Sequence, residues 1–180
     1  MRFTLLNGEP DPEAPLNAHL DCLTAELHRR GHQAEILTLR QMNLRGCTGC
    51  FGCWLKTPGV CVKRDDSAIL CRAALRSDLL LFATPMILGT TSALLLRAVE
   101  QMIPLLLPYI VIEGGEMHHS ARYKHYPLCA LLLGSCDKED QEITSAIWKR
   151  TTRNMKTKLV ATLLAEHPIQ EVADAILAVA

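Results

Sequence analysis

The sequence predicts an α/β fold in which a five-stranded parallel sheet is covered by helices on both faces. Short apolar runs alternate with helical patterns five times along the 180 residues. The runs LLLFATP (79–85) and CALLLG (129–134) are almost continuously apolar, as strands buried on both faces are. Because crossovers between parallel strands have one handedness, this order folds into a parallel sheet with helices on each side. The length is that of one domain, residues 1–180.

The first two predicted strands flank an amphipathic helix. FTLLN (3–7) is a short apolar run typical of a strand. Leucines then recur at helical spacing over residues 16–27, and Gly31 is a natural stop for that helix. AEILTL (34–39) predicts the second strand, and a cysteine-rich loop (45–64) follows it.

The middle of the chain repeats the alternation. Asp65 and Asp66 are suitable N-terminal caps for a helix through SAILCRAALRS (67–77). The third strand, residues 79–85, comes next, and a further helix is expected from about Ser92.

The last third of the chain begins with an exception to the pattern. Residues 109–127 form an irregular excursion that is long for a connection, which indicates a role in function or assembly. A fourth strand (129–134), a helix (138–155), a fifth strand (159–165) and a closing helix (168–180) complete the expected order.

Composition and charge exclude several classes of partner. Apolar residues make up 49% and charged residues 21%, as in ordinary globular domains. Lys plus Arg and Asp plus Glu both number 19, so the net charge offers no general attraction to nucleic acid or anionic lipid. The apolar stretch 93–112 is interrupted by charged residues and prolines, which argues against a membrane-spanning helix. We therefore expect neither nucleic acid nor a membrane as a partner.

Two further segments bear on location and on ligands. The first residues, MRFTLLNGEPDPE (1–13), have an apolar run too short for a secretory signal and turn acidic at once, so we expect a cytoplasmic protein. The basic run KRTTRNMKTK (149–158) carries five positive charges and no acid. It is either a solvated helix end or a nucleotide phosphate site.

The strongest chemical signal is CTGCFGCWLKTPGVC (47–61), which holds four of the eight cysteines. The first three are separated by two residues each, a spacing that can wrap a loop around an iron-sulfur cluster. Glycines between them allow tight turns. A single zinc ion, a redox-active cysteine pair and inert reduced thiols are the alternatives. The remaining cysteines fall mostly within apolar patterns and are expected to be buried, except Cys136 after the fourth strand.

The unusual segments are expected at one edge of the sheet. In open α/β sheets, ligands bind beyond the carboxyl ends of the strands, where the strand order reverses. The segments that follow strands are NGEPDPEAP (7–15), the cysteine-rich loop, TPMILGTTS (84–92) and GSCDKED (134–140). We expect all four to face this edge.

Several motifs together resemble a known family. They are CTGCFGC (47–53) with GVCVKRDD (59–66), the pair Thr84 and Pro85 after the third strand, and G-x-x-S ending at Ser92. They are similar to motifs of the flavodoxin-fold NAD(P)H-dependent FMN reductases and of their iron-sulfur flavoprotein relatives. The resemblance implies a flavodoxin-like fold, FMN held by three loops at the sheet edge, and a 4Fe-4S cluster. It also implies a homo-oligomer in which the cluster lies near a neighbouring subunit's flavin.

The resemblance also implies which residues bind each group. The cluster ligands would be Cys47, Cys50, Cys53 and Cys61. The residues bordering the flavin would be Thr84, Pro85, Met86, Ile87 and Gly89 after the third strand, and Gly134 and Ser135 after the fourth.

The first loop departs from the family pattern. Relatives are usually rich in Ser, Thr and Arg there, and these residues cradle the FMN phosphate at a helix N-terminus. Here the loop reads GEPDPEAPLN, with three acids where a dianion should lie and three prolines that remove amide donors. This departure favours weakened phosphate binding.

Two functions follow from these features. One is a redox flavoprotein that takes electrons from NAD(P)H or from a protein donor and passes them through FMN and the cluster. The flavin would perform that chemistry, so no catalytic side chain is required. The other is a flavin-free protein of the same fold that uses the cysteine-rich loop to bind a metal or cluster in a non-enzymatic role.

Overall fold

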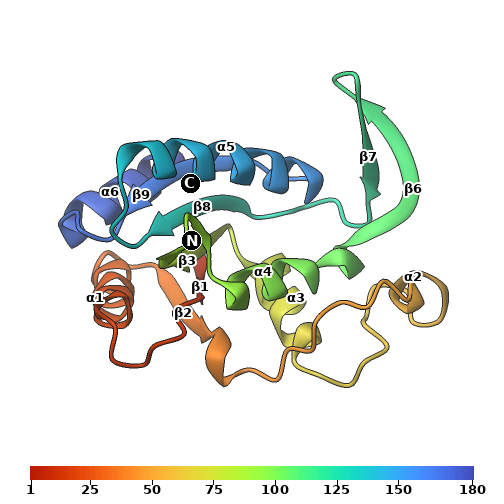
Figure 1. Cartoon of the computed structure of the whole chain (residues 1–180), viewed down its shortest axis with the longest axis horizontal. Coiled ribbons are helices and arrows are strands. Elements are labelled where there is room, and N and C mark those ends of the chain that lie inside the picture. Colours follow the sequence, from red (N-terminus) through yellow and green to blue (C-terminus); the bar gives the residue numbers. More distant parts are fainter.

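Five parallel strands form the centre of the structure, a computed structural model that describes residues 1–180 (Figure 1). Across the sheet they are β2 (Gln33–Thr38), β1 (Arg2–Asn7), β3 (Leu79–Thr84), β8 (Leu128–Leu133) and β9 (Leu159–Leu164). The predicted five-stranded parallel sheet is confirmed. The strand order reverses beside β1, because β2 lies on one side of it and β3 on the other.

Helices cover both faces, as the sequence predicts. On one face lie α1 (Pro15–Arg29) and α6 (Ile169–Val179), and on the other α3 (Ser67–Arg76), α4 (Ala93–Glu100) and α5 (Lys138–Asn154). Successive strand residues alternate between the two cores, which explains why the central strands are apolar at nearly every position.

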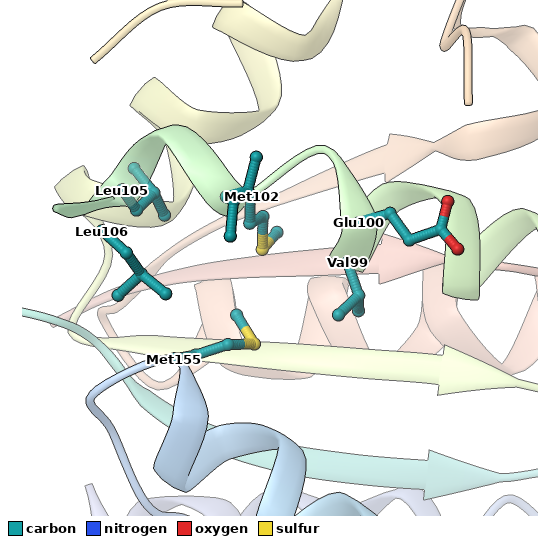
Figure 2. Close-up of a pocket in the computed structure, with 7 residues that line it drawn as sticks. Val99, Glu100, Met102, Leu105, Leu106 and Met155 are labelled. Atoms are coloured by element: carbon teal, nitrogen blue, oxygen red, sulfur yellow. The ribbon is translucent and has the colours of Figure 1, made fainter. Parts of the chain in front are cut away.

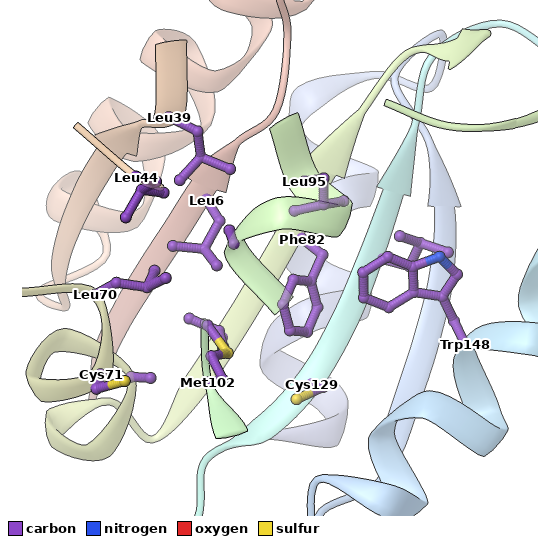
Figure 3. Packing of buried hydrophobic residues seen from close by; sticks show 14 of the residues in the cluster. Leu6, Leu39, Leu44, Leu70, Cys71, Phe82, Leu95, Met102, Cys129 and Trp148 are labelled. Atoms are coloured by element: carbon purple, nitrogen blue, oxygen red, sulfur yellow. The ribbon is translucent and has the colours of Figure 1, made fainter. Parts of the chain in front are cut away.

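The core under α3, α4 and α5 is anchored by two aromatic rings. Phe82 of β3 is completely buried, and its ring centroid lies 4.7 Å from that of Trp148 on α5. Figure 3 shows the two rings side by side over the sheet, with Trp148 reaching in from α5 and with Leu95 and Met102 near Phe82. This contact fixes α5 against the sheet.

The excursion predicted over 109–127 is irregular only in part. Residues 106–121 form an antiparallel hairpin of β6 (Leu106–Glu113) and β7 (Glu116–Ala121) that projects from the body of the molecule (Figure 1). Gly114 and Gly115 have φ angles of 60° and 81°, which the tight turn requires. The apolar stretch after Ser92 is therefore a short helix followed by a strand.

Several short elements were not predicted. They are η1 (Leu39–Gln41), α2 (Gly52–Leu55), the small hairpin of β4 (Met86–Ile87) and β5 (Thr90–Thr91), and η2 (Ile103–Leu105). No helix in the structure has the length and apolar character needed to cross a membrane.

The basic run pairs with the β6–β7 hairpin. Arg150 and Arg153 lie 3.2 and 2.9 Å from Glu116 carboxylate oxygens, and Lys156 lies 2.8 Å from Glu113. These ion pairs involve three of the five positively charged residues of the run. A structural role at the helix end is therefore favoured over a nucleotide phosphate site.

Replacing Phe82 by Ala should lower the free energy of unfolding by about 3–5 kcal/mol, because it empties a fully buried ring position against Trp148. Leu88→Ala, at a fully exposed position, is the matched control and should change stability by less than about 0.5 kcal/mol. Urea denaturation followed by Trp fluorescence measures both. Equal stabilities of the two variants would contradict this view of the core.

Candidate functional site

A pocket of about 430 Å³ lies at the carboxyl edge of the sheet. It is bordered by the start of α1 and by the segments after β1, β3, β8 and β9. Its lining residues are Glu9, Ala14, Pro15, Leu16, His19, Pro85, Gly134, Ser135, Ala165 and Glu166. Its volume lies in the range of small-molecule sites, and it occupies the place where the strand order reverses. We call it the sheet-edge pocket.

A second pocket is too small and too apolar to be the main site. It measures about 110 Å³ and lies between the end of α4, η2 and the end of α5 (Figure 2). Figure 2 shows Val99, Met102, Leu105 and Met155 pointing toward a common space, with the Glu100 carboxylate directed away. It offers few of the polar groups that orient a cofactor.

Three of the seven residues assigned to the flavin line the sheet-edge pocket: Pro85, Gly134 and Ser135. A Cβ added at Gly134 would lie 3.2 Å from the Cα of Pro85, so a side chain here would push the segments after β3 and β8 slightly apart. Ser135 is exposed, and its hydroxyl is available to a ligand.

The other four assigned residues do not line this pocket. Thr84 is fully buried, and its hydroxyl accepts the Ser92 N–H at 2.9 Å and donates to the Pro85 carbonyl. Met86 packs against the core. Ile87 and Gly89 belong to the small β4–β5 hairpin, which folds beside α5.

Sequence reasoning missed two titratable residues of the pocket. Glu166 is the second residue after β9, so the carboxyl-edge rule applied to the fifth strand would have found it. His19 lies one turn into α1 and carried no signal. Burial lowers the pKa of His19, so its imidazole is mainly neutral at neutral pH, and its Nε2 is buried without a hydrogen-bond partner.

In the first loop (residues 8–15), backbone N–H groups donate hydrogen bonds to side-chain oxygens two residues earlier in the chain. Asn7 Oδ1 accepts the Glu9 N–H at 3.0 Å, Glu9 Oε1 accepts the Asp11 N–H at 3.0 Å, and Asp11 Oδ1 accepts the Glu13 N–H at 2.9 Å. Each oxygen thus takes the place that a phosphate oxygen would need. Glu9 is only 5% exposed and faces the pocket.

Electrostatics oppose a dianion at this loop. Two like charges about 4 Å apart repel each other by about 4 kcal/mol at an effective dielectric near 20. A helix N-terminus stabilises a bound anion by only about 0.3 to 2 kcal/mol. Helix α1 begins at Pro15 without a side-chain cap, so little compensates for the carboxylates.

The four cysteines of the cysteine-rich loop share one cavity of about 50 Å³. Cys47 and Cys50 are exposed, Cys61 is half-buried and Cys53 is buried. The sulfur donor set is the one an iron-sulfur cluster uses, but the cavity has room for only one or two water molecules. No three Cys, His, Asp or Glu side chains are arranged to hold a metal ion. The thiols therefore supply suitable ligands in an arrangement that does not yet fit a cluster.

The position of the cysteine-rich loop corrects the expectation that it faces the carboxyl edge. Its cavity is also lined by Gln101, Ile103 and Pro104, which follow α4. Helix α4 runs back across the sheet, so these residues lie near the amino ends of the strands. Figure 1 accordingly shows α2 at one end of the long axis and α1 at the other.

The indole of Trp54 ties the loop to the β6–β7 hairpin. Its Nε1 donates to the Leu106 carbonyl at 3.0 Å, and its ring lies 5.3 Å from Phe51 and 4.9 Å from His119. These contacts anchor the cysteine-rich loop against the rest of the structure.

Burial and hydrogen bonding divide the thiols by acidity. The Gly52 N–H, and to a smaller degree the Thr48 hydroxyl and Lys63, lower the pKa of Cys50. Burial, with smaller effects of the neighbouring thiols, raises the pKa of Cys53. Cys50 is therefore the more reactive thiol of the two.

Comparisons with known proteins found similar sequences over part of the chain and similar folds over most of it. No family model matches the chain. Two iron-sulfur flavoproteins of Archaeoglobus fulgidus are similar: one is 27% identical over 101 residues, which is 56% of this chain and 48% of the relative. The other is 30% identical over 104 residues, 58% of this chain and 46% of the relative. The chain spans about half the length of these relatives.

Solved structures share the fold. An apo NADH:FMN oxidoreductase has 12% identity and a TM-score of 0.62, covering 99% of this chain and 90% of its own. The azoreductase AzrA has 12% identity and a TM-score of 0.64, covering 99% and 93%. An NAD(P)H:quinone oxidoreductase from Methanothermobacter marburgensis has 15% identity and a TM-score of 0.62, covering 99% and 92%. The flavodoxin-like fold is thereby confirmed.

Alkylation of the metal-free protein should distinguish the thiols. At about pH 8, iodoacetamide should modify Cys50 before Cys53, because the Gly52 N–H stabilises the first thiolate and burial disfavours the second. Peptide mass spectrometry over a time course measures the order. Earlier modification of Cys53 would show that the loop is arranged differently.

Proposed function

The resemblance to the flavodoxin-fold FMN reductases and iron-sulfur flavoproteins is confirmed, and from it we propose that the chain is a redox flavoprotein of the NAD(P)H-dependent FMN reductase type. A flavin ring occupies the sheet-edge pocket in this proposal. When bound, it accepts a hydride from the nicotinamide and passes electrons to an acceptor.

The pocket carries this proposal. It lies where the strand order reverses, and its volume of about 430 Å³ accommodates a three-ring heterocycle. Pro85 and Gly134 form a wall without long side chains against which a flat ring can lie, and the Ser135 hydroxyl can orient its polar edge. The names of several neighbours, such as the NADH:FMN oxidoreductase, support a flavin and a nicotinamide donor.

The fit of FMN is uneven. The ring part matches the pocket, but the first loop presents carboxylates where the phosphate would lie. We therefore assign no residue to phosphate binding and no side chain to catalysis. The chain's own contribution is to bind the ring, to orient it and to exclude water from one of its faces.

A 4Fe-4S cluster is the second part of the proposal. The sulfurs of Cys47, Cys50, Cys53 and Cys61 would hold it, and the names of the two similar flavoproteins support it. Because the present cavity is small, the cysteine-rich loop has to open to admit a cluster. No electron step is assigned to it here.

We further propose a homo-oligomer. The β6–β7 hairpin exposes Ile110, Ile112 and Met117 at 56%, 77% and 77%. A projecting two-stranded hairpin is marginally stable by itself, and a second subunit would cover these side chains.

A flavin-free protein that uses only the cysteine-rich loop is the alternative, and the acidic first loop favours it. The two functions differ in flavin binding. Protein purified without oxygen should contain or take up flavin and oxidise NADH or NADPH if the flavoprotein proposal holds. Protein with iron but without flavin affinity would support the alternative.

Ser135→Trp should fill the sheet-edge pocket and reduce flavin affinity about tenfold or more, because an indole occupies part of the ring's volume. Position 135 is exposed, so the fold should tolerate the change. The control, Glu139→Trp, changes a nearby exposed residue outside the pocket and should leave affinity unchanged. Quenching of flavin fluorescence measures both. Equal flavin affinities in the two variants would show that the flavin ring does not bind in this pocket.

Cys50→Ser should abolish stoichiometric iron while the protein still unfolds cooperatively, because the loop lies outside both sheet cores. Cys136→Ser, at a thiol outside the cysteine cavity, is the control and should retain iron. The measurement is the iron content of the two variants after purification without oxygen. Iron retained in Cys50→Ser would overturn the ligand assignment.

A further inference from the structure

We propose that the sheet-edge pocket binds riboflavin, a flavin without the 5′-phosphate, more tightly than FMN. This inference rests on the proposed function, since it concerns the ligand of the same pocket. It follows from the hydrogen bonds of the first loop, the segment that the family resemblance assigns to the phosphate.

No backbone amide of the first loop is left to bind a phosphate. Three of its eight positions are prolines and have no N–H. The amides of Glu9, Asp11 and Glu13 donate to side chains two residues earlier in the chain. Those of Gly8 and Ala14 donate to backbone carbonyls at 2.8 and 3.3 Å. All eight positions from residue 8 to residue 15 are therefore without a free donor, so a phosphate could find free amides only at the start of α1.

The pocket also lacks a cation. None of its ten lining residues is Lys or Arg, and two of them, Glu9 and Glu166, are acids. The nearby Arg40 does not line the pocket, and its Nη1 donates to the Glu9 carbonyl at 3.3 Å and to Asn17 Oδ1 at 2.8 Å. Burial keeps the imidazole of His19 mainly neutral by lowering its pKa. A phosphate in the pocket would meet two carboxylates and no positively charged lining residue.

The loop is held in this conformation from several sides. Asn17 Nδ2, which has two hydrogens to donate, lies within hydrogen-bond distance of three of its carbonyl oxygens, at 2.9, 3.1 and 3.0 Å. Asn7 Nδ2 donates to Asn17 Oδ1 at 2.8 Å, and Ser92 Oγ donates to the Gly8 carbonyl at 2.6 Å. Turning the amides toward a ligand would break these bonds together, so rearrangement on binding is disfavoured.

The polyol chain of riboflavin matches the acidic residues of the sheet-edge pocket better than a phosphate does. Only Oε1 of the buried Glu9 carboxylate accepts a hydrogen bond within the chain, so Oε2 remains for a ligand hydroxyl. Glu166 provides another acceptor at the rim. Riboflavin ends in a neutral hydroxyl that donates to such oxygens, whereas FMN ends in a group with a charge of about −1.5 to −2. The same carboxylates attract the first and repel the second.

The test is a titration of flavin-free protein with riboflavin and with FMN, followed by flavin fluorescence at low salt. Riboflavin should bind about tenfold more tightly or better, and added salt should narrow the difference by screening the repulsion. Tighter binding of FMN would overturn this inference and leave the proposed function intact. Binding of neither flavin would overturn both.

Isosteric variants locate the cause. Glu9→Gln keeps the acceptor for the Asp11 N–H and removes the charge, so it should raise FMN affinity several-fold and weaken riboflavin binding, because the ligand hydroxyl loses a carboxylate acceptor. The double variant Asp11→Asn and Glu13→Gln removes charge at exposed positions outside the pocket lining, so it should raise FMN affinity and leave riboflavin affinity nearly unchanged. Glu139→Gln, an exposed acid outside the pocket, is the matched control. Unchanged FMN affinity in both acid-loop variants would show that these carboxylates do not select the flavin.

Discussion

Burial of β3 and β8 on both faces is the constraint on which the rest of the structure depends. All six residues of β3 are buried, and so are five of the six in β8. Each buried aliphatic side chain contributes about 1.5–3 kcal/mol, so these two strands hold a large share of the stability. Because parallel strands end at one edge, burying them also brings the segments after β1, β3, β8 and β9 together. The sheet-edge pocket is a consequence of that arrangement.

The sheet was predictable because its strands carry the required pattern in short continuous segments. Residues 79–84 and 128–133 are too short and too apolar to be surface helices, and the alternating order leaves little choice of topology. The β6–β7 hairpin was not predictable in the same way. Its first strand contains Pro108, which lacks an N–H, and the strand register shifts between Leu106 and Ile110 around that proline. Local pattern therefore indicated an irregular segment where long-range pairing makes a hairpin.

The site was predicted less completely than the fold, and the reason lies in the β4–β5 turn. Leu88 at its tip has a φ of 51°, a left-handed conformation that leucine rarely adopts and that no sequence pattern indicates. This turn carries Ile87 and Gly89 away from the pocket, while the first residue after β3, Pro85, stays. Positions next to a strand end are fixed by the sheet. Positions a few residues further depend on turn geometry, which the sequence alone does not determine.

The separation of the two candidate centres bears on how they would act together. The sheet-edge pocket and the cysteine cavity share no lining residue, and α1 and α2 lie at opposite ends of the molecule (Figure 1). Trp54 fixes the cysteine-rich loop to the hairpin, so the loop is held away from the pocket of its own chain. Within one chain the two sites therefore do not meet, and only a contact with another subunit could bring a cysteine-rich loop close to a sheet-edge pocket. The exposed hairpin beside the cysteine-rich loop is where the proposed homo-oligomer would form such a contact.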